Sequence, residues 1–319
     1  MNPSFESRFA GQMQDMLQFK KSLGYADNSY VGYLLNFDRF CMENYPDASV
    51  LTKEIVMDWG RKKQNQKPES VIRKIIALRE FARYLNSVGD NAYVAPLEMF
   101  GRRKPFVPYI YTDEELTAFF RASDRIPEDK RSPYRHLVVP VMFRLLYCCG
   151  LRPSEARHLH CSEFDLDAGI LHIKETKRHK DRTVPVAPGM LELCRKYHSL
   201  SNLAYKDREY FFKNPNGDIY PENWLQRHFW RCWKIAGITS FHGSTPRIYD
   251  FRHNYATRIL QKWLEDGKEL QTYLPYLSAY MGHYDFSETA YYIHLLPDRL
   301  VRTESIHWDE VNAVIPEVK

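Results

Sequence analysis

Four short stretches of the sequence hold the side chains that could do chemistry. In the first, GLRPSE at residues 150–155, Arg152 stands where a helix is predicted to start. A positive charge is unfavourable at that end of a helix, because the helix dipole is itself positive there. Arg152 therefore needs a negative partner, which could be Glu155 in a structural ion pair or an anion bound in a functional site. The residues alone leave both interpretations open.

The second stretch is a basic hairpin. Residues 170–174 and 182–186 are short, rich in β-branched side chains and partly alternating, which predicts two strands with a polar connection between them. Its basic side chains are Lys174, Lys177, Arg178, Lys180 and Arg182. Such a hairpin could insert its tip into a groove of DNA, or it could be a solvated turn. The pattern favours neither interpretation.

The third stretch, YDFRHNYATRIL, is predicted to be a helix. Its apolar face is predicted from Phe251, Tyr255 and Ile259, which recur every four residues. Successive residues of a helix point about 100° apart. Arg252 is therefore expected to point away from the core, either as a surface base or as the edge of a site.

The fourth stretch, MGHYDFSETAYYIH, ends in two adjacent tyrosines. Gly282 is predicted to end one helix, with His283 directly after it, and Ser287 is predicted to cap the next. Tyr291 and Tyr292 follow on that helix. Because they point about 100° apart, they cannot share one role. One can pack in the core while the other faces a cleft.

Taken in order, the segments GLRPSEARHL, TKRHKDRTVPV, YDFRHNYAT and MGHYDFSETAYYIH resemble the four motifs of the tyrosine recombinase (phage integrase) family. The resemblance covers about residues 112–300. It implies a site-specific DNA recombinase of the integrase or transposase type, such as mobile elements carry. Such an enzyme cleaves and rejoins DNA through a covalent 3′-phosphotyrosine, with no metal and no other cofactor. Its expected partner is double-stranded DNA at specific sites, synapsed by a homotetramer, with sibling recombinases as further candidates.

The resemblance assigns roles to the basic residues. It makes Arg152 and Arg252 ligands of the scissile phosphate, with Glu155 supporting Arg152. Lys177 matches the hairpin lysine of the family and is expected to protonate the leaving 5′-oxygen. Lys180 occupies the second lysine position and is expected at the DNA backbone, although the two lysines could exchange these roles.

The resemblance also separates the tyrosines. His283 matches the family's His or Trp, and the nucleophile lies nine residues further on, at Tyr292. Tyr291 is left to packing.

One position departs from the family pattern. Tyr249 stands three residues before Arg252, where a histidine is usual. A tyrosine can donate one hydrogen bond to a phosphate, but it does not titrate near neutral pH as histidine does. We therefore expect Tyr249 to bind the phosphate without transferring a proton. His242 is the nearby alternative.

The elements that must position these side chains fall into two predicted domains. Apolar residues at helical spacing predict four helices within residues 1–100, followed by a linker at 101–111. Thr112 is predicted to cap the first helix of the second domain, residues 112–304, which is predicted to be mainly α with a small antiparallel β-sheet. The resemblance implies that the first domain is the helical, SAM-like core-binding domain. It implies that the second has the DNA breaking-rejoining fold of the family's catalytic domain.

Further contacts are expected outside the four motifs. The resemblance implies that the two domains form a clamp around duplex DNA. The linker bases Arg102, Arg103 and Lys104 are then expected near phosphates, as is Arg182 in the hairpin. The tail, residues 305–319, is expected either to dock on a neighbouring protomer or to pack on its own chain.

Two other functions remain in competition. A catalytically weak relative could bind DNA as an accessory protein, and Tyr249 is the feature that favours it. A type IB topoisomerase would use similar chemistry without synapsis of specific sites.

Composition narrows the class further. Apolar residues make up 44% of the chain, and the net charge of +5 is compatible with a nucleic-acid partner without requiring one. No apolar run reaches the roughly 18 residues of a membrane helix, and no signal peptide is apparent, so we expect a soluble, cytoplasmic protein. Residues 157–161, RHLHC, resemble half of a metal site. A structural zinc needs four ligands, and no second cluster is evident.

Overall fold

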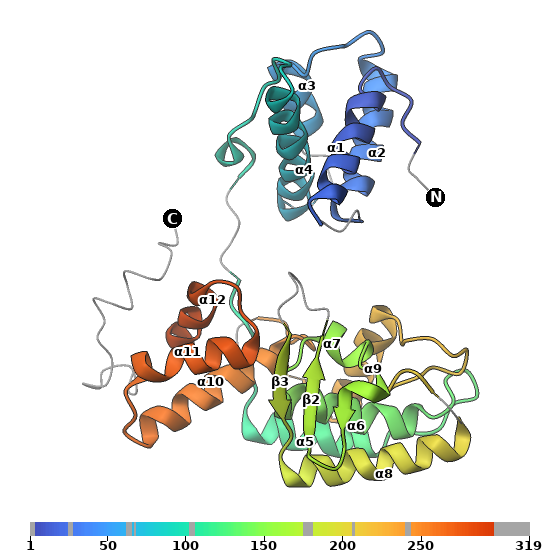
Figure 1. The fold of residues 1–319 in the computed structure, drawn as a ribbon, viewed down its shortest axis with the longest axis vertical. Coiled ribbons are helices and arrows are strands. Elements are labelled where there is room, and N and C mark those ends of the chain that lie inside the picture. The colour runs from blue at the N-terminus through green and yellow to red at the C-terminus, as the bar shows by residue number, and fades with distance from the viewer. Residues whose placement is uncertain are drawn as a thin grey trace. The chain divides into compact units, whose positions relative to one another are not determined.

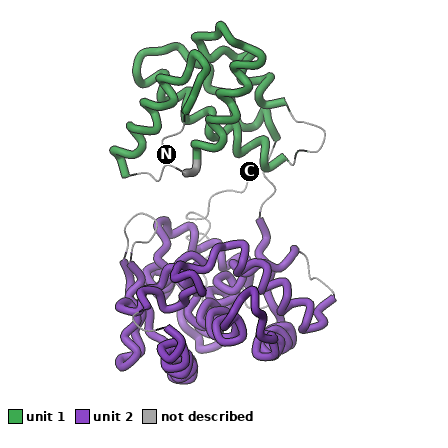
Figure 2. The backbone as a smooth tube through the Cα atoms, turned by 90° about the vertical axis from the view of Figure 1, so that its right-hand side faces the viewer, with its two compact units in different colours: residues 1–105 green, residues 106–319 purple. Residues whose placement is uncertain are grey.

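The computed structural model of the chain divides into two compact units, Met1–Pro105 and Phe106–Lys319 (Figure 2). Several residues named in the sequence analysis lie outside the described residues. They are the linker bases Arg102, Arg103 and Lys104, the hairpin residues Lys177 and Lys180, His242 and the tail 305–319. The structure describes residues 4–24, 28–61, 66, 68–101, 106–174, 181–205, 208–239 and 244–296.

The first unit is a small helical bundle, as predicted. Among its described residues the helices are α1 (Ala10–Ser22), α2 (Asn28–Asn44), α3 (Lys53–Gly60), α4 (Pro68–Ser87) and the short 3₁₀ helix η1 (Leu97–Phe100). Thr52 caps α3 by accepting a hydrogen bond from the backbone of Ile55. Phe9 holds the bundle together, because its ring contacts those of Phe37 and Phe81 at centroid distances of 6.3 and 6.2 Å.

The second unit is mainly helical and carries one small sheet (Figure 1). Its described helices are α5 (Asp113–Asp124), α6 (Arg135–Cys149), α7 (Pro153–Arg157), η2 (Cys161–Glu163), α8 (Pro188–Ala204), α9 (Glu222–Ile235), α10 (Asp250–Glu265), α11 (Leu270–Met281), α12 (Phe286–Ala290) and η3 (Tyr291–Leu295). None of the helices in the described part of the chain is long and apolar enough to cross a membrane.

The sheet contains the predicted hairpin. Strands β2 (Ile170–Ile173) and β3 (Arg182–Pro185) pair antiparallel, and β1 (Phe164–Asp165) pairs antiparallel with β2, which gives the order β1-β2-β3. Sequence reasoning missed β1, because two residues are too few to show an alternating pattern.

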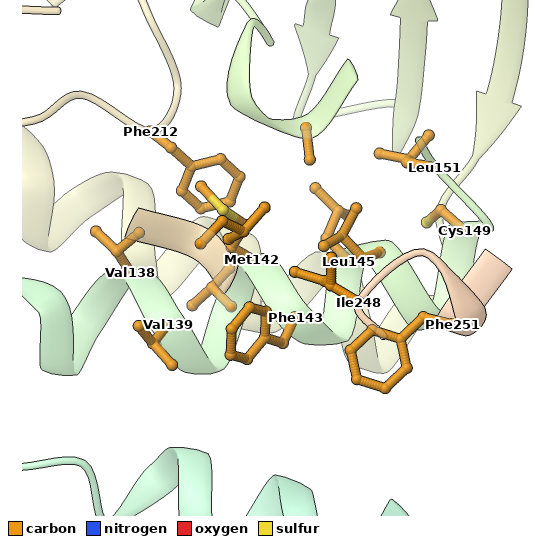
Figure 3. Packing of buried hydrophobic residues seen from close by; sticks show 14 of the residues in the cluster. Val138, Val139, Met142, Phe143, Leu145, Cys149, Leu151, Phe212, Ile248 and Phe251 are labelled. Carbon is orange, nitrogen blue, oxygen red and sulfur yellow. The ribbon is translucent and has the colours of Figure 1, made fainter. Parts of the chain in front are cut away.

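Helix α6 is the centre of the second unit. Most of its side chains are buried, and those of Val138, Met142 and Leu145 pack in the core of the unit (Figure 3). The helix ends at Gly150, where φ is +59°. A Cβ there would lie 2.6 Å from the ring of Tyr255, so both the turn and the packing require glycine.

The chain enters this unit through aromatic residues. Tyr109 and Tyr111 are buried in its core, although composition had assigned them to the linker. Asn254 of α10 holds this segment, because its side chain accepts a hydrogen bond from the backbone of Tyr111 at 2.9 Å and donates one to the backbone of Tyr109 at 2.9 Å. Thr112 then caps α5 with a complete capping box, as predicted.

Helix α10 differs from its predicted orientation. Phe251 is buried as expected, but Tyr255 and Ile259 are only half-buried, and Arg252 is 1% exposed. The reason is that α10 packs on two sides, against α6 and against a second apolar cluster formed with α11 and η3. The alternative that Arg252 is a surface base is therefore wrong.

The N-terminal cap of α12 also differs from the prediction. Asp285 caps α12, and its carboxylate accepts a hydrogen bond from the backbone of Ser287 at 2.9 Å. The prediction that Ser287 is the cap was wrong by two residues. Tyr292 and Ile293 of η3 are buried in the cluster with α10 and α11.

Candidate active site

Three arginines meet at the carboxyl end of α11. Arg182 donates through Nε to the carbonyl of residue 280 at 2.8 Å, Arg252 donates to that of residue 281, and Arg152 donates through Nη2 to that of residue 282 at 2.8 Å. The last carbonyls of a helix have no partner within it, and they form the negative end of its dipole. This helix end therefore gathers cations from three distant parts of the chain.

Arg252 is the most deeply buried of the three. Its Nη1 donates to the carbonyl of Gly150 at 2.7 Å, so it joins the end of α6 to the end of α11. Its Nε is buried with no hydrogen-bond partner in the described part of the chain. Burial and the neighbouring charge of Arg152 lower the pKa of Arg252. An arginine nevertheless stays charged in proteins.

A carboxylate holds the other two arginines. Arg152 donates to Glu155 at 2.7 Å through Nη1 and at 2.8 Å through its backbone nitrogen, so the ion pair weighed from the sequence is present. Arg182 donates to both oxygens of Glu155, at 2.9 and 2.8 Å. Burial acts against the charge of Glu155, but Arg182 and then Arg252 lower its pKa to about 2.

Arg182 was expected near DNA phosphates, and in the structure its side chain is bonded inside the protein. Its side chain is 6% exposed, and all three guanidinium nitrogens donate to atoms inside the protein. Three of its five N–H donors are thus used inside the protein, on a side chain that is almost fully buried. Arg182 is the first residue of β3, and its side chain reaches Glu155 of α7 and the carbonyl of Tyr280 in α11.

His283 lies directly after the end of α11 and is buried. Its Nδ1 is 2.7 Å from the hydroxyl of Thr289, which belongs to α12. Burial, followed by the charges of Arg252 and Arg152, lowers the pKa of His283 to about 3. The imidazole is therefore neutral at physiological pH, with one ring nitrogen engaged by Thr289.

Tyr292 lies against this histidine. The two rings are stacked with centroids 5.9 Å apart, and the phenol is 3.2 Å from Nδ1 of His253. Burial raises the pKa of Tyr292, while Arg252 and Arg152 oppose that shift. By contrast, Tyr291 is half-buried and donates to the backbone of Phe106 at 2.5 Å.

His253 was not among the predicted site residues. Burial, followed by the charges of Arg247 and Arg252, lowers its pKa to about 4, so it too is neutral. Its position directly after Arg252 in the third motif was the signal that could have found it.

Tyr249 borders the site and is its most exposed tyrosine, at 37%. Its ring centroid is 5.2 Å from that of His253. Burial acts against the charge of Arg152, but Glu155 and then Tyr249 raise the pKa of that arginine. Tyr249 therefore lies beside Arg152, on the accessible side of the site.

The structure thus gathers five of the six predicted catalytic residues, and the sixth, Lys177, lies outside the described residues. The five are Arg152, Tyr249, Arg252, His283 and Tyr292. His160, in the metal-like stretch RHLHC, instead contacts the ring of Tyr210 at a centroid distance of 4.7 Å. No group of three metal-ligating side chains forms within the described ranges.

Residues 111–299, more than half of the chain, match the model of the phage integrase family. The chain belongs to this family. The predicted membership is thereby confirmed, as is the predicted class of enzyme, a tyrosine recombinase.

Two relatives align with this chain over nearly its whole length. It is 30% identical to the putative integrase/recombinase y4rE of Sinorhizobium fredii, over 90% of this chain and 92% of that protein. It is 26% identical to the tyrosine recombinase XerD of Pseudomonas putida, over 96% of this chain and 98% of that protein.

Solved structures show the same fold. The site-specific recombinase XerH, in a post-cleavage complex with its difH substrate, aligns with a TM-score of 0.65 at 17% identity, over 94% of this chain and 85% of that one. A lambda integrase dimer bound to a core site aligns with a TM-score of 0.61 at 15% identity, over 88% and 94%. The predicted fold, mainly α with a small antiparallel sheet, is confirmed.

Proposed function

We propose that this phage integrase family member is a site-specific DNA recombinase that cleaves and rejoins DNA through a 3′-phosphotyrosine on Tyr292. One observation carries the proposal. The phenol of Tyr292 lies among two arginines and two neutral histidines, gathered from segments up to 140 residues apart in the chain. Cationic donors and a potential nucleophile are therefore held in a single buried site.

The arginines suit a phosphodiester substrate. Attack on phosphorus builds negative charge on the nonbridging oxygens, and preorganised donors that meet this charge are usually the largest catalytic contribution. The side chain of Arg152 is 19% exposed, and Nε of Arg252 has no partner among the described residues. Both guanidinium groups stay charged and offer forked donors. We assign them the two nonbridging oxygens of the scissile phosphate.

His283 and Tyr249 add neutral donors to the same phosphate. His283 is neutral and held at Nδ1 by Thr289, which leaves its other ring nitrogen for a ligand. Tyr249 reaches the accessible side of the site beside Arg152. A tyrosine hydroxyl can donate one hydrogen bond, so the departure from the family's usual histidine preserves a donor.

The chemical step transfers one proton at each end. The phenol of Tyr292 loses its proton, which the charges of Arg252 and Arg152 favour, and His253 lies within hydrogen-bond distance of that phenol. The phenolate oxygen attacks phosphorus, the bond to the 5′-oxygen breaks, and Lys177 gives that oxygen its proton. A 5′-hydroxyl of another strand then attacks the phosphotyrosine and releases Tyr292. The arginines and the lysine supply the charge and the proton, so the scheme requires no metal.

Double-stranded DNA is the proposed partner, bound at specific sites by a homotetramer with or without sibling recombinases. The solved recombinases of like fold support DNA as the partner, since XerH and lambda integrase are described in complex with DNA. We place the first unit in the role of a core-binding domain and the tail 305–319 in contact with a neighbouring protomer.

Trapping the covalent intermediate tests the proposal. The binding site is first located by footprinting on DNA that flanks the gene, and is then rebuilt as a nicked suicide duplex. Wild-type protein and Tyr291→Phe should form a covalent adduct, and Tyr292→Phe should form none. An adduct in the Tyr292→Phe protein would overturn the assignment. Tight binding without any wild-type adduct would instead favour an accessory DNA-binding protein.

A further inference from the structure

The ion pair between Arg182 and Glu155 is buried inside the protein. The two side chains are 6% and 7% exposed, and each carboxylate oxygen accepts one guanidinium nitrogen, at 2.9 and 2.8 Å. Parallel bonds between a guanidinium and a carboxylate fix the orientation of both groups as well as their distance. Glu155 therefore has one orientation available to it.

That orientation is the one that holds Arg152. The same two oxygens accept Nη1 of Arg152 at 2.7 Å and its backbone nitrogen at 2.8 Å. A carboxylate bonded to Arg152 alone could turn with it as a unit. Because Arg182 anchors Glu155 to β3, the guanidinium of Arg152 is held relative to the sheet.

Arg182 also holds the end of α11. Its Nε donates to the carbonyl of Tyr280 at 2.8 Å, two residues before Gly282 and three before His283. A Cβ added at Gly282 would lie 3.1 Å from both Cδ and Nη1 of Arg182. The helix end is thus closely fitted around the stem and head of this arginine.

Charge points to the same role. The cluster holds three guanidinium groups and one carboxylate, so its net charge is +2. The carboxylate of Glu155 pairs with both Arg152 and Arg182. A buried ion pair contributes little net stability compared with apolar side chains of similar size. The specific geometry of this pair therefore calls for a reason other than stability.

We propose that Arg182 is a positioning residue of the recombinase site: without touching the phosphate, it fixes Glu155 and the end of α11 so that Arg152 and His283 face the same phosphate. This inference rests on the function proposed above. It replaces the direct DNA contact expected from the position of Arg182 in the hairpin.

Single-turnover cleavage of the nicked duplex, at saturating full-length protein, is the test. Arg182→Gln should bind DNA within about twofold of wild type but cleave about 100-fold more slowly, the loss expected for a displaced catalytic group. Arg182→Lys keeps the charge but can hold only one oxygen, and should recover about tenfold of that loss. Arg195→Gln is the matched control, because Arg195 is exposed on α8 and donates to the backbone carbonyls of Leu166 and Asp167, away from the site.

Two readouts separate positioning from a general structural defect. Glu155→Gln and Arg182→Gln act through one contact, so the double variant should cleave about as slowly as the slower single variant. Loss of Arg182 should also raise the pKa of Glu155, which Arg152 and Arg252 would still face. Cleavage by Arg182→Gln should therefore begin to fall at a higher pH than cleavage by the wild-type protein.

Several results would overturn the inference. If Arg182→Gln cleaves at the wild-type rate, whatever its melting temperature, the positioning role is wrong and the proposed function is unaffected. Weaker binding with a flatter salt dependence, and normal cleavage at saturation, would make Arg182 a phosphate ligand. If Arg182→Gln does not fold, Arg182→Lys decides by the same criteria. A wild-type chain that forms no adduct would overturn the proposed function, and this inference with it.

Discussion

Replacing Gly282 by alanine tests how tightly the end of α11 is fitted to the arginine cluster. Gly282 adopts φ +62° and ψ +45°, a left-handed conformation that costs a side chain about 1 kcal/mol. Its Cβ would in addition lie 3.1 Å from Arg182, which three hydrogen bonds hold in place. Overpacking of this kind adds about 1–2 kcal/mol.

Gly267 offers a matched control. It follows α10 in the same unit with φ +70°, and a Cβ there would have no neighbour within 4 Å. Gly267→Ala therefore carries the backbone cost alone, and its melting temperature should fall by about 3 °C in a unit of this size. The melting temperature of Gly282→Ala should fall by about 8 °C, because the contact with Arg182 adds to the same backbone strain.

Cleavage should separate the two variants more clearly than stability. At a temperature where both are folded, Gly267→Ala should cleave at the wild-type rate, whereas Gly282→Ala should be about 10- to 100-fold slower through displaced Arg152 and His283. Differential scanning calorimetry and single-turnover cleavage measure the two effects. Equal melting temperatures and equal rates for the two variants would refute the close fit between Gly282 and Arg182.

Three further changes probe single groups. His228 is buried without a partner for either ring nitrogen in the described part of the chain, and burial, followed by the charge of Arg135, lowers its pKa to about 4. The unfolded chain therefore binds a proton at a higher pH than the folded chain, so the free energy of unfolding should fall as pH drops from about 6.5 toward 4. Urea unfolding at pH 7 and pH 5 should show a smaller fall for His228→Phe. An equal fall in the variant and the wild-type protein would contradict the assignment. Tyr249→Phe should slow cleavage about tenfold by removing one hydrogen bond to the phosphate, and Tyr249→His should restore the rate; equal rates for all three proteins would show that the hydroxyl is not used. Thr289→Val keeps the shape of a buried side chain but removes the hydroxyl 2.7 Å from His283, and should lower cleavage about tenfold with DNA affinity unchanged in a binding titration.

Local features of this protein were predictable from the sequence because their causes lie within a few residues. The cap Thr112 bonds to a backbone nitrogen three residues away, and the hairpin strands follow from their own composition. The family followed from the order of four short motifs, each of which is a local pattern.

Burial and partnership of the charged residues depended on tertiary structure. Helical spacing gives the direction of Arg252 but not the number of elements packed around it, so a residue expected near the surface is instead buried between the ends of α6 and α11. Arg152 reaches a carbonyl 130 residues away, and Arg182 one 98 residues away. No local pattern records such pairs, because the folding of the whole unit creates them. Sequence therefore identified which side chains could do chemistry, and tertiary structure determined that Arg182 holds the site together from inside.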